Sequence, residues 1–304
     1  MCDLTAPHFK DEEKAREYLE ALRWPNGPVC PHCGNEGGWK LEGKSTRPGL
    51  YKCVAYPCRE QFTVTVGTVF ERSKIPLTKW LMAVHLMCAS KKGISSHQLH
   101  RMLGVTYKTA WFMSHRIREA MREEGGGLLG SGGGVVEADE TFGNERKPRR
   151  QGKKGRGYAH KTKVLTLVER GGKARSFHVP AVNAKTLAPI LREQIAKEAC
   201  LMTDEAFQYV KVGREFAAHG VTHHGLREYV RGDIHSNTVE SYFSVFKRGL
   251  MGTFHHVSPG HLKRYLGEFD FRYNYRAALG HNDAARADVV LKGIGGKRLM
   301  YRDS

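Results

Sequence analysis

The sequence predicts a multidomain protein in which a small cysteine-rich module and a helical segment precede an α/β domain. Three observations support this fold class. Four cysteines lie within 29 residues near the N-terminus, helical periodicity runs through residues 77–121, and residues 125–134 hold seven glycines. After these glycines, short apolar strands alternate with helices. We expect an N-terminal helix with the cysteine-rich module in residues 1–72 and the helical segment in residues 73–124. A glycine-rich linker, 125–134, would then lead to the α/β domain, 135–280, and a basic C-terminal tail, 281–304.

The chain is strongly basic. Its 304 residues include 49 lysines and arginines against 31 acidic residues, so the formal net charge is 49 − 31 = +18. Such an excess predicts a polyanionic partner, most often nucleic acid. The longest nearly apolar run, residues 80–88, is too short to span a bilayer, and the N-terminal stretch lacks a signal-peptide pattern. We therefore expect a cytoplasmic protein that binds nucleic acid.

Two close pairs of cysteines predict a structural zinc site. Cys30 and Cys33 form the first pair, and Cys53 and Cys58 form the second after 19 intervening residues. Zinc takes four ligands in a tetrahedron, which two pairs on tight turns can supply. The total of seven cysteines, with one tight cluster, favours metal over disulfides. His32 could replace one thiolate, but its adjacency to Cys33 makes that geometry awkward.

Helical patterns occupy the rest of the first 122 residues. Residues 10–22 predict an acidic amphipathic helix. Residues 94–111 resemble a helix-turn-helix, because Ser95 can cap a first helix and Gly104 permits a sharp turn before a second. Basic residues off the core face of the second helix would suit the major groove of DNA. They are Lys108, His115, Arg116, Arg118 and Arg122. The alternative is a plain helical pair that packs on the catalytic domain.

The residues after 134 predict an α/β domain. The expected strands are residues 135–139, 163–169, 174–179 and 200–203. Asn183 can cap a helix that extends to about residue 199, and the chain beyond Asn237 has a second helical pattern. The basic stretch 146–156 predicts a solvated loop that grips the DNA backbone.

Three acidic residues and a lysine form the candidate catalytic set. We expect Asp139 to end the first strand and Asp204 a later one, while Glu240 lies on a helix with 35 residues between it and Asp204. Lys247 follows Glu240 by seven residues, which is two helical turns along one face. Neighbouring strands can bring two carboxylates together, and a helix that crosses the sheet can add a third. Such a cluster can hold two Mg²⁺ or Mn²⁺ ions for an in-line phosphoryl displacement.

These motifs resemble those of the DDE transposases of bacterial insertion sequences, in the subgroup with an N-terminal zinc ribbon. The resemblance covers most of the chain, and its most specific piece is residues 235–249. Further pieces are residues 30–33, 109–113, 116–118, 139–141, 252–257 and 268–274. The resemblance implies an RNase H-like catalytic domain, dependence on divalent metal, and action at the inverted-repeat ends of a transposon.

Within this resemblance each candidate residue has an expected role. Asp139 would bridge two metal ions, Asp204 would hold one of them and Glu240 the other, and Lys247 would touch a phosphate near the scissile bond. In parts of the family the third ligand is asparagine, and Asn237 lies one helical turn before Glu240. Asn237 therefore has three open roles: metal ligand, hydrogen-bond partner of a ligand, or helix cap.

The implied reaction has two steps on double-stranded DNA, which are hydrolysis at the transposon end and strand transfer into target DNA. Because the pairing of two ends calls for two active sites, we expect a homodimer. The main alternative is a non-catalytic regulator that binds DNA through the zinc ribbon and the helix-turn-helix. It explains the first 122 residues and the charge, but it leaves the acidic residues without a role. A repair nuclease and a decayed transposase copy are further alternatives.

Overall fold

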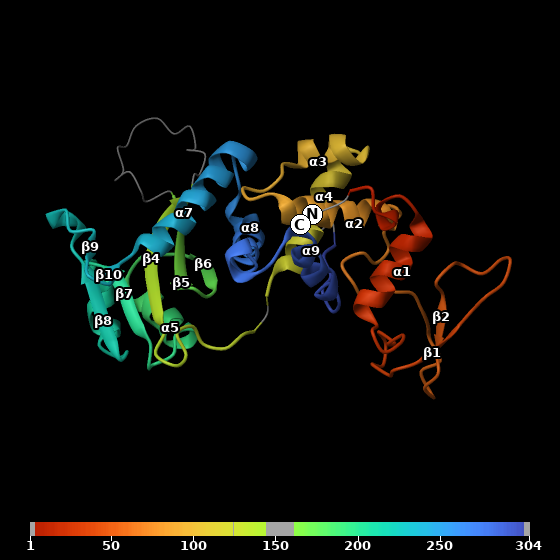
Figure 1. The fold of residues 1–304 in the computed structure, drawn as a ribbon, viewed down its shortest axis with the longest axis horizontal. Coiled ribbons are helices and arrows are strands. Elements are labelled where there is room, and N and C mark those ends of the chain that lie inside the picture. The colour runs from red at the N-terminus through yellow and green to blue at the C-terminus, as the bar shows by residue number, and fades with distance from the viewer. Residues whose placement is uncertain (1–3, 124, 144–160, 301–304) are drawn as a thin grey trace. The chain divides into compact units, whose positions relative to one another are not determined.

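The computed structural model describes residues 4–123, 125–143 and 161–300. The chain forms two compact units, and Figure 1 shows their helices and strands. The first unit contains Met1–Ser90, Ile94–Met121 and His281–Ser304, and the second contains Lys91–Gly93 and Arg122–Gly280. Each unit therefore joins segments that are distant in sequence. No helix within the described residues is long and apolar enough to cross a membrane.

The N-terminal part of the first unit contains one helix and a small sheet. Helix α1 spans Glu12–Arg23, and Asp11 caps it by accepting a hydrogen bond from the Lys14 N–H. Ala15 and Leu19 are buried on its apolar face, which confirms the predicted amphipathic helix. The sheet pairs its antiparallel strands in the order β1 (Gly38–Lys40), β2 (Tyr51–Cys53) and β3 (Gln61–Phe62).

Four more helices complete the first unit. They are α2 (Leu77–Ala89), α3 (Ser96–Leu103), α4 (Tyr107–Met121) and α9 (Asp283–Lys292). Ser95 caps α3 by accepting a hydrogen bond from the Gln98 N–H. Gly104 has a left-handed backbone, with φ +59°, and ends the helix there. The predicted cap is therefore present at the start of α3, and the predicted turn is present between α3 and α4.

Helix α4 corrects one prediction. His115 is fully buried, Arg118 is 1% exposed and Arg116 is 7% exposed, so these three residues do not lie off the core face. The Arg116 guanidinium donates to the Glu71 carbonyl at 2.7 Å, and that of Arg118 donates to Ser114 Oγ at 2.9 Å. The two guanidinium groups therefore bond to groups inside the first unit, because α4 packs against α2, α3 and α9. Only the start of the helix, with Lys108, is open to solvent.

The C-terminal segment is more than a basic tail. Helix α9 lies within residues 281–304 and packs against α1, α2 and α4. Its Val290 and Leu291 are buried, and the Tyr18 hydroxyl donates a hydrogen bond to the Asp288 carboxylate. Apolar residues spaced along this segment form part of the core of the first unit, which the basic residues around them concealed in the sequence.

A five-stranded sheet forms the centre of the second unit. Its strands are β4 (Val135–Gly143), β5 (Thr162–Glu169), β6 (Ala174–Val179), β7 (Cys200–Asp204) and β8 (Ala218–Thr222). Their order across the sheet is β6-β5-β4-β7-β8. The β4–β5 and β5–β6 pairs are antiparallel, whereas the β4–β7 and β7–β8 pairs are parallel. The predicted strand pair and the later strand are confirmed.

The remaining elements of the second unit are helices and one short hairpin. They are α5 (Ala184–Gln194), α6 (Val210–Gly213), β9 (Val230–Arg231), β10 (Ile234–His235), α7 (Asn237–Gly249) and α8 (Pro259–Asn274). Asn183 caps α5, as predicted, by accepting from the Thr186 N–H at 2.9 Å. The helix is shorter than expected, because Ile195 is already extended.

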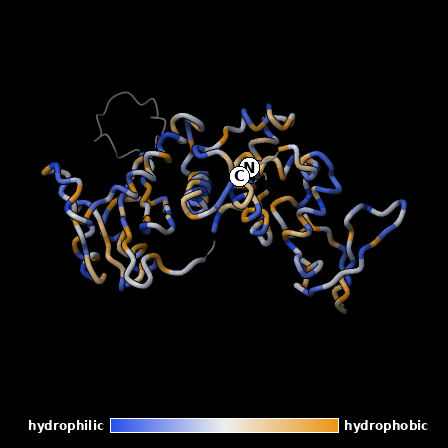
Figure 2. The backbone as a smooth tube through the Cα atoms, in the orientation of Figure 1, coloured by the Kyte–Doolittle hydropathy of each residue, from blue (hydrophilic) through white to orange (hydrophobic). Residues whose placement is uncertain are grey.

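Apolar side chains cover both faces of the five-stranded sheet. Val136 and Ala138 of β4 lie in one core with Leu187 and Leu191 of α5. The opposite face holds a second core, in which Val164 and Val168 of β5 meet α7 and α8; the helix residues in it include Val239, Tyr242, Phe243, Phe246 and Phe269. Figure 2 shows hydrophobic residues recurring along these strands and helices. Alternate residues of each strand therefore face different helices.

The glycine-rich segment before β4 is not a flexible linker over residues 129–134. Leu129 is buried, and its N–H donates to the Gln194 carbonyl at 2.9 Å. Gly130 has φ +72°, and a Cβ at this position would lie 2.6 Å from the Cβ of Ala199. The glycines here allow a close approach of two backbones. The predicted loop 146–156 lies outside the described residues.

Candidate active site and zinc site

Four cysteine thiols gather in the first unit. The Sγ atoms of Cys30, Cys33, Cys53 and Cys58 all lie within 4.8 Å of one another. The Cys30–Cys58 and Cys33–Cys53 sulfur pairs are 3.8 and 3.6 Å apart. A tetrahedron of thiolates with Zn–S distances of about 2.3 Å has edges of about 3.8 Å. The four thiols therefore fit a structural zinc ion, and His32 is not part of the group.

Tight turns place these thiols. The Gly34 N–H donates to the Cys30 carbonyl at 2.8 Å, and Gly34 adopts φ +75°. Cys53 ends β2, and its N–H donates to the Glu60 carbonyl at 2.9 Å. The backbone N–H of Asn35 lowers the pKa of Cys33, which favours the thiolate that binds metal.

The register of β4 and β7 places two of the predicted acids side by side. Val135 pairs with Cys200 and Glu137 with Met202 across these parallel strands. When this register is continued by two residues, Asp139 lies opposite Asp204 on the same face of the sheet. Asp204 is the last residue of β7, as predicted.

Asp139 does not end its strand, so this prediction was wrong. β4 continues for four more residues because it pairs with β5, from Glu140 opposite Leu165 to Gly143 opposite Thr162. The sequence suggested an end at the acid because polar residues begin there. The ladder with β5 keeps residues 140–143 in the sheet, and Asp139 therefore lies within a strand held by hydrogen bonds.

Carboxylates crowd around Asp139. Burial, together with the nearby carboxylates of Glu140, Asp204 and Glu240, raises the pKa of Asp139 to about 7. The Glu140 N–H opposes this shift by donating to the Asp139 carboxylate at 2.6 Å. A divalent cation would offset the repulsion between these negatively charged carboxylates. Among the described residues, the acids are not drawn as close together as the four thiols.

The adjacent Glu140 is not an alternative ligand on this face. Its side chain accepts a hydrogen bond from the Tyr209 hydroxyl at 2.6 Å, and Tyr209 belongs to the core on the α5 side of the sheet. Burial also raises the pKa of Glu140. Successive residues of a strand point to opposite faces, so Asp139 and Glu140 belong to different environments.

Helix α7 carries the other predicted site residues. Glu240 lies in its first turn and accepts a hydrogen bond from Ser236 Oγ at 3.0 Å. Asn237 is the first helical residue, and Ser236 occupies the cap position in its place. Lys247 is exposed two turns later, with its Nζ 5.9 Å from the centre of the Phe243 ring. The carboxylates of Asp204 and Glu240 both contribute to the raised pKa of Asp139, and Asn237 and Lys247 lie on the same helix as Glu240.

Comparison with known proteins identifies the family. Residues 131–274 match the family model of the ISXO2-like transposase domain, and residues 10–61 match that of the transposase zinc-ribbon domain. The chain is 31% identical over 283 residues to an uncharacterized protein in transposable element ISH50 of Halobacterium salinarum. That match covers 87% of this chain and 91% of the relative. The chain belongs to the ISXO2-like family of insertion-sequence transposases.

The two matched regions correspond to the two sites. The zinc-ribbon match contains all four cysteines of the thiol group. The transposase-domain match begins just before β4 and ends at Asn274, the last residue of α8. It therefore contains the acidic residues of the transposase, together with the whole sheet that positions them.

Glu137 is a buried acid of the transposase that was not predicted from the sequence. Glu137 lies two residues before Asp139 on β4 and is fully buried. Its carboxylate accepts from Arg170 Nε at 2.6 Å and from the backbone N–H groups of Thr238 and Val239 at 2.8 and 2.9 Å. An acidic residue inside an otherwise apolar strand pattern is the signal that could have found it, because such a residue needs partners.

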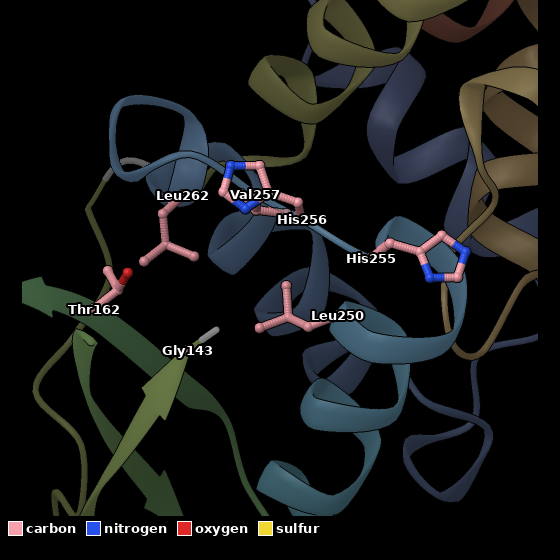
Figure 3. Close-up of a pocket in the computed structure, with 7 residues that line it drawn as sticks. All are labelled: Gly143, Thr162, Leu250, His255, His256, Val257 and Leu262. Carbon is pink, nitrogen blue, oxygen red and sulfur yellow. The ribbon is translucent and has the colours of Figure 1, made fainter. Parts of the chain in front are cut away.

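Among the described residues, the two histidines near the end of β4 belong to no group of potential metal ligands. His255 and His256 lie beside a pocket of only about 10 Å³, which is room for about one water molecule. Figure 3 shows their rings pointing in different directions. The pocket is lined by Gly143, Thr162, Leu250, His255, His256, Val257 and Leu262.

Proposed function

We propose that this transposase binds the inverted-repeat ends of its element and catalyses metal-dependent phosphodiester hydrolysis and strand transfer into target DNA. The observation that supports the proposal is the register of β4 and β7 from Val135–Cys200 to Glu137–Met202, which, continued by two residues, would align Asp139 with Asp204 on the face that α7 contacts. An RNase H-like fold is supported by the sheet order β6-β5-β4-β7-β8, with two antiparallel pairs followed by two parallel pairs.

Asp139, Asp204 and Glu240 would hold two Mg²⁺ or Mn²⁺ ions. These ions would activate water and neutralise the leaving 3′ oxygen. Asp139 would bind metal together with Asp204 and Glu240, because both of these carboxylates raise its pKa. Asn237 would hydrogen-bond a ligand or bind metal itself, since it shares a helix face with Glu240. Lys247 would hold a DNA phosphate near the scissile bond through its charge.

The first unit would bind the transposon ends. Helices α3 and α4 with the turn at Gly104 support a helix-turn-helix, and the start of α4 would enter the major groove. Lys108, Tyr107 and Arg101 are exposed around this turn and would make the contacts. Arg116 and Arg118 would stabilise the unit from inside and touch no DNA. A homodimer would pair the two ends.

The test is to map nicks after incubation of the purified protein with its flanking DNA and Mg²⁺ or Mn²⁺. We expect nicks at the inverted-repeat ends with the wild type, and none with Asp139→Ala or Asp204→Ala. Both variants should still bind the ends, because the acids contact metal and not the recognised bases. Asp233→Ala is the matched control: it removes an exposed aspartate of the second unit and should leave the nicks unchanged.

Three results would contradict the proposal. Binding of the ends with no nicking under either metal would favour the regulator or a decayed copy. Nicks at random positions would indicate a general nuclease. Loss of end binding in Asp204→Ala would show that this aspartate contributes to folding or recognition.

A further inference from the structure

Glu137 lies beneath the first turn of α7, on the strand that carries Asp139. Four donors reach its carboxylate. They are Arg170 Nε at 2.6 Å, the Thr238 and Val239 N–H groups at 2.8 and 2.9 Å, and the Thr238 hydroxyl at 2.8 Å. We infer that Glu137 is a positioning residue, which holds α7 so that Glu240 reaches the metal site. This inference rests on the proposed function.

Two of these donors, the N–H groups of Thr238 and Val239, belong to the backbone of the first turn of α7. The first N–H groups of an α-helix have no partner within the helix. Ser236, at the cap position of α7, does not satisfy them with its side chain. Glu137 takes that place from the neighbouring strand, and its negative charge also meets the positive end of the helix dipole. The contact therefore joins β4 to α7 at one defined point of the helix.

Arg170 compensates the buried negative charge of Glu137 and orients its carboxylate. Its guanidinium pairs with Glu137 and also donates to the carbonyl oxygens of Asp233 and His235, at 2.8 and 2.9 Å. A buried carboxylate without such a partner would be strongly unfavourable. Arg170 thereby ties the chain just before α7 to the same carboxylate that holds its first turn.

The geometry connects this contact to Glu240. Thr238 and Val239 immediately precede Glu240, so holding their N–H groups fixes the rotation of the first turn of α7 about its axis. Asp139 follows Glu137 by two residues and points to the same face of β4. One strand therefore carries a proposed metal ligand and the anchor for another. A small misplacement of a catalytic group can cost about 10²-fold in rate.

Hydrogen exchange measures the contact itself. We expect the Thr238 and Val239 amides to exchange at least about 10-fold faster in Glu137→Gln than in the wild type, because the amide side chain loses the negative charge and keeps only one acceptor oxygen for four donors. The amides of α8 should keep their protection. Glu140→Gln is the matched control, since it also replaces a glutamate of β4, but a half-buried one that faces Tyr209. Unchanged protection at Thr238 and Val239 in Glu137→Gln would overturn the inference.

Mn²⁺ binding to the full-length protein measures the consequence. Loss of a group that orients a metal ligand typically costs 10–100-fold in affinity, so we expect a loss of about that size in Glu137→Gln. In a Glu240→Ala background, Glu137→Gln should cause no further loss, because its effect passes through Glu240. An equal loss in both backgrounds would show a general structural role and would overturn the inference.

Two additions make the outcome unambiguous. Thr238→Val removes one donor to Glu137 and keeps both N–H groups, so it should weaken Mn²⁺ binding several-fold even if Glu137→Gln fails to fold. Wild-type binding that Asp204→Ala abolishes would support the proposed active site independently of Glu137. A wild type that binds no Mn²⁺ would overturn that site and this inference together, whereas normal Mn²⁺ binding by Glu137→Gln would overturn the inference alone.

Discussion

Acidic residues of the second unit differ in what surrounds them. Glu137 is held by an arginine and a helix N-terminus, whereas Asp139 lies among other carboxylates. Asp270 of α8 is in a third environment, because it accepts hydrogen bonds from the Tyr242 hydroxyl at 2.6 Å and from Ser176 Oγ at 2.7 Å. Asp139 combines a raised pKa with several neighbouring carboxylates that raise it, and this combination suits a metal ligand.

Asp270 makes the stability of the transposase depend on pH. Burial raises its pKa from 3.8 to about 6, even though Tyr242 and Ser176 donate to it. The neutral form therefore stabilises the fold fully below about pH 4, and this contribution is lost as the pH rises through 6. Between pH 5 and 7 the free energy of unfolding of the wild type should fall by about 1 kcal/mol relative to Asp270→Asn.

Urea denaturation of both proteins at several pH values measures this difference. The comparison cancels the other titrating groups, because both proteins share them. A difference between the two free energies of unfolding that stays constant from pH 5 to 7 would show that Asp270 ionises as in an unfolded chain.

At the scale of single residues, the sequence predicted the cysteine group better than it predicted burial. The four cysteines form their group because metal-ligand spacing is a local property of the chain. Arg116 and Arg118 were expected at a DNA surface, and both are buried. Their partners, the Glu71 carbonyl and Ser114, do not stand out in the sequence. The charge pattern alone therefore could not show that the two arginines form hydrogen bonds within the protein.

Helices α7 and α8 pack against each other through a glycine. A Cβ on Gly249, the last residue of α7, would collide with the Phe269 ring of α8 and lie 2.7 Å from the Lys92 carbonyl oxygen. Neither a buried ring nor a backbone oxygen can easily move away. The sequence does not distinguish this glycine from the many others, because the contact joins segments that are far apart in the chain.

Replacement of Gly249 by alanine should therefore destabilise the second unit. We expect a loss of about 1–3 kcal/mol in the free energy of unfolding, which is typical of overpacking. Gly260→Ala in α8 is the control: nothing lies within 4 Å of its Cβ, so its stability should stay the same or rise slightly. Equal thermal stability of Gly249→Ala and the wild type would contradict the close packing.

Elements were predictable where their signal is local. Helix α7 begins at Asn237 and buries Val239, Tyr242, Phe243 and Phe246, as its spacing predicts. The end of β4 was not predictable, because the ladder with β5 decides it. The role of Glu137 depends in the same way on Arg170 and Thr238, which lie 33 and 101 residues away in the chain.

At the scale of the whole molecule, the segment His281–Ser304 belongs to the first unit, although the second unit precedes it in the chain. Helix α9 places Ala287, Val290 and Leu291 in a core whose other residues come from the first 121 positions. Local sequence patterns predicted a tail here, because the residues that pack against α9 are more than 150 positions away in the chain.

Removal of residues 281–304 should therefore destabilise the first unit and leave the second folded. Hydrogen exchange should show lost protection in α2 and unchanged protection in β4 and β5. A full-length variant with the exposed Lys292 and Arg298 replaced by glutamine controls for the loss of positive charge and should protect α2 normally. If the truncated protein keeps a protected α2, then α9 contributes little to the core.

The late position of α9 also sets an order of events during synthesis. All of residues 122–280 leave the ribosome before the last core helix of the first unit exists. The sheet that carries the acids can thus fold while the unit that holds the zinc-binding cysteines is still incomplete. A frameshift after codon 280 would leave every proposed catalytic residue in place and still produce a chain whose zinc-binding unit lacks its closing helix.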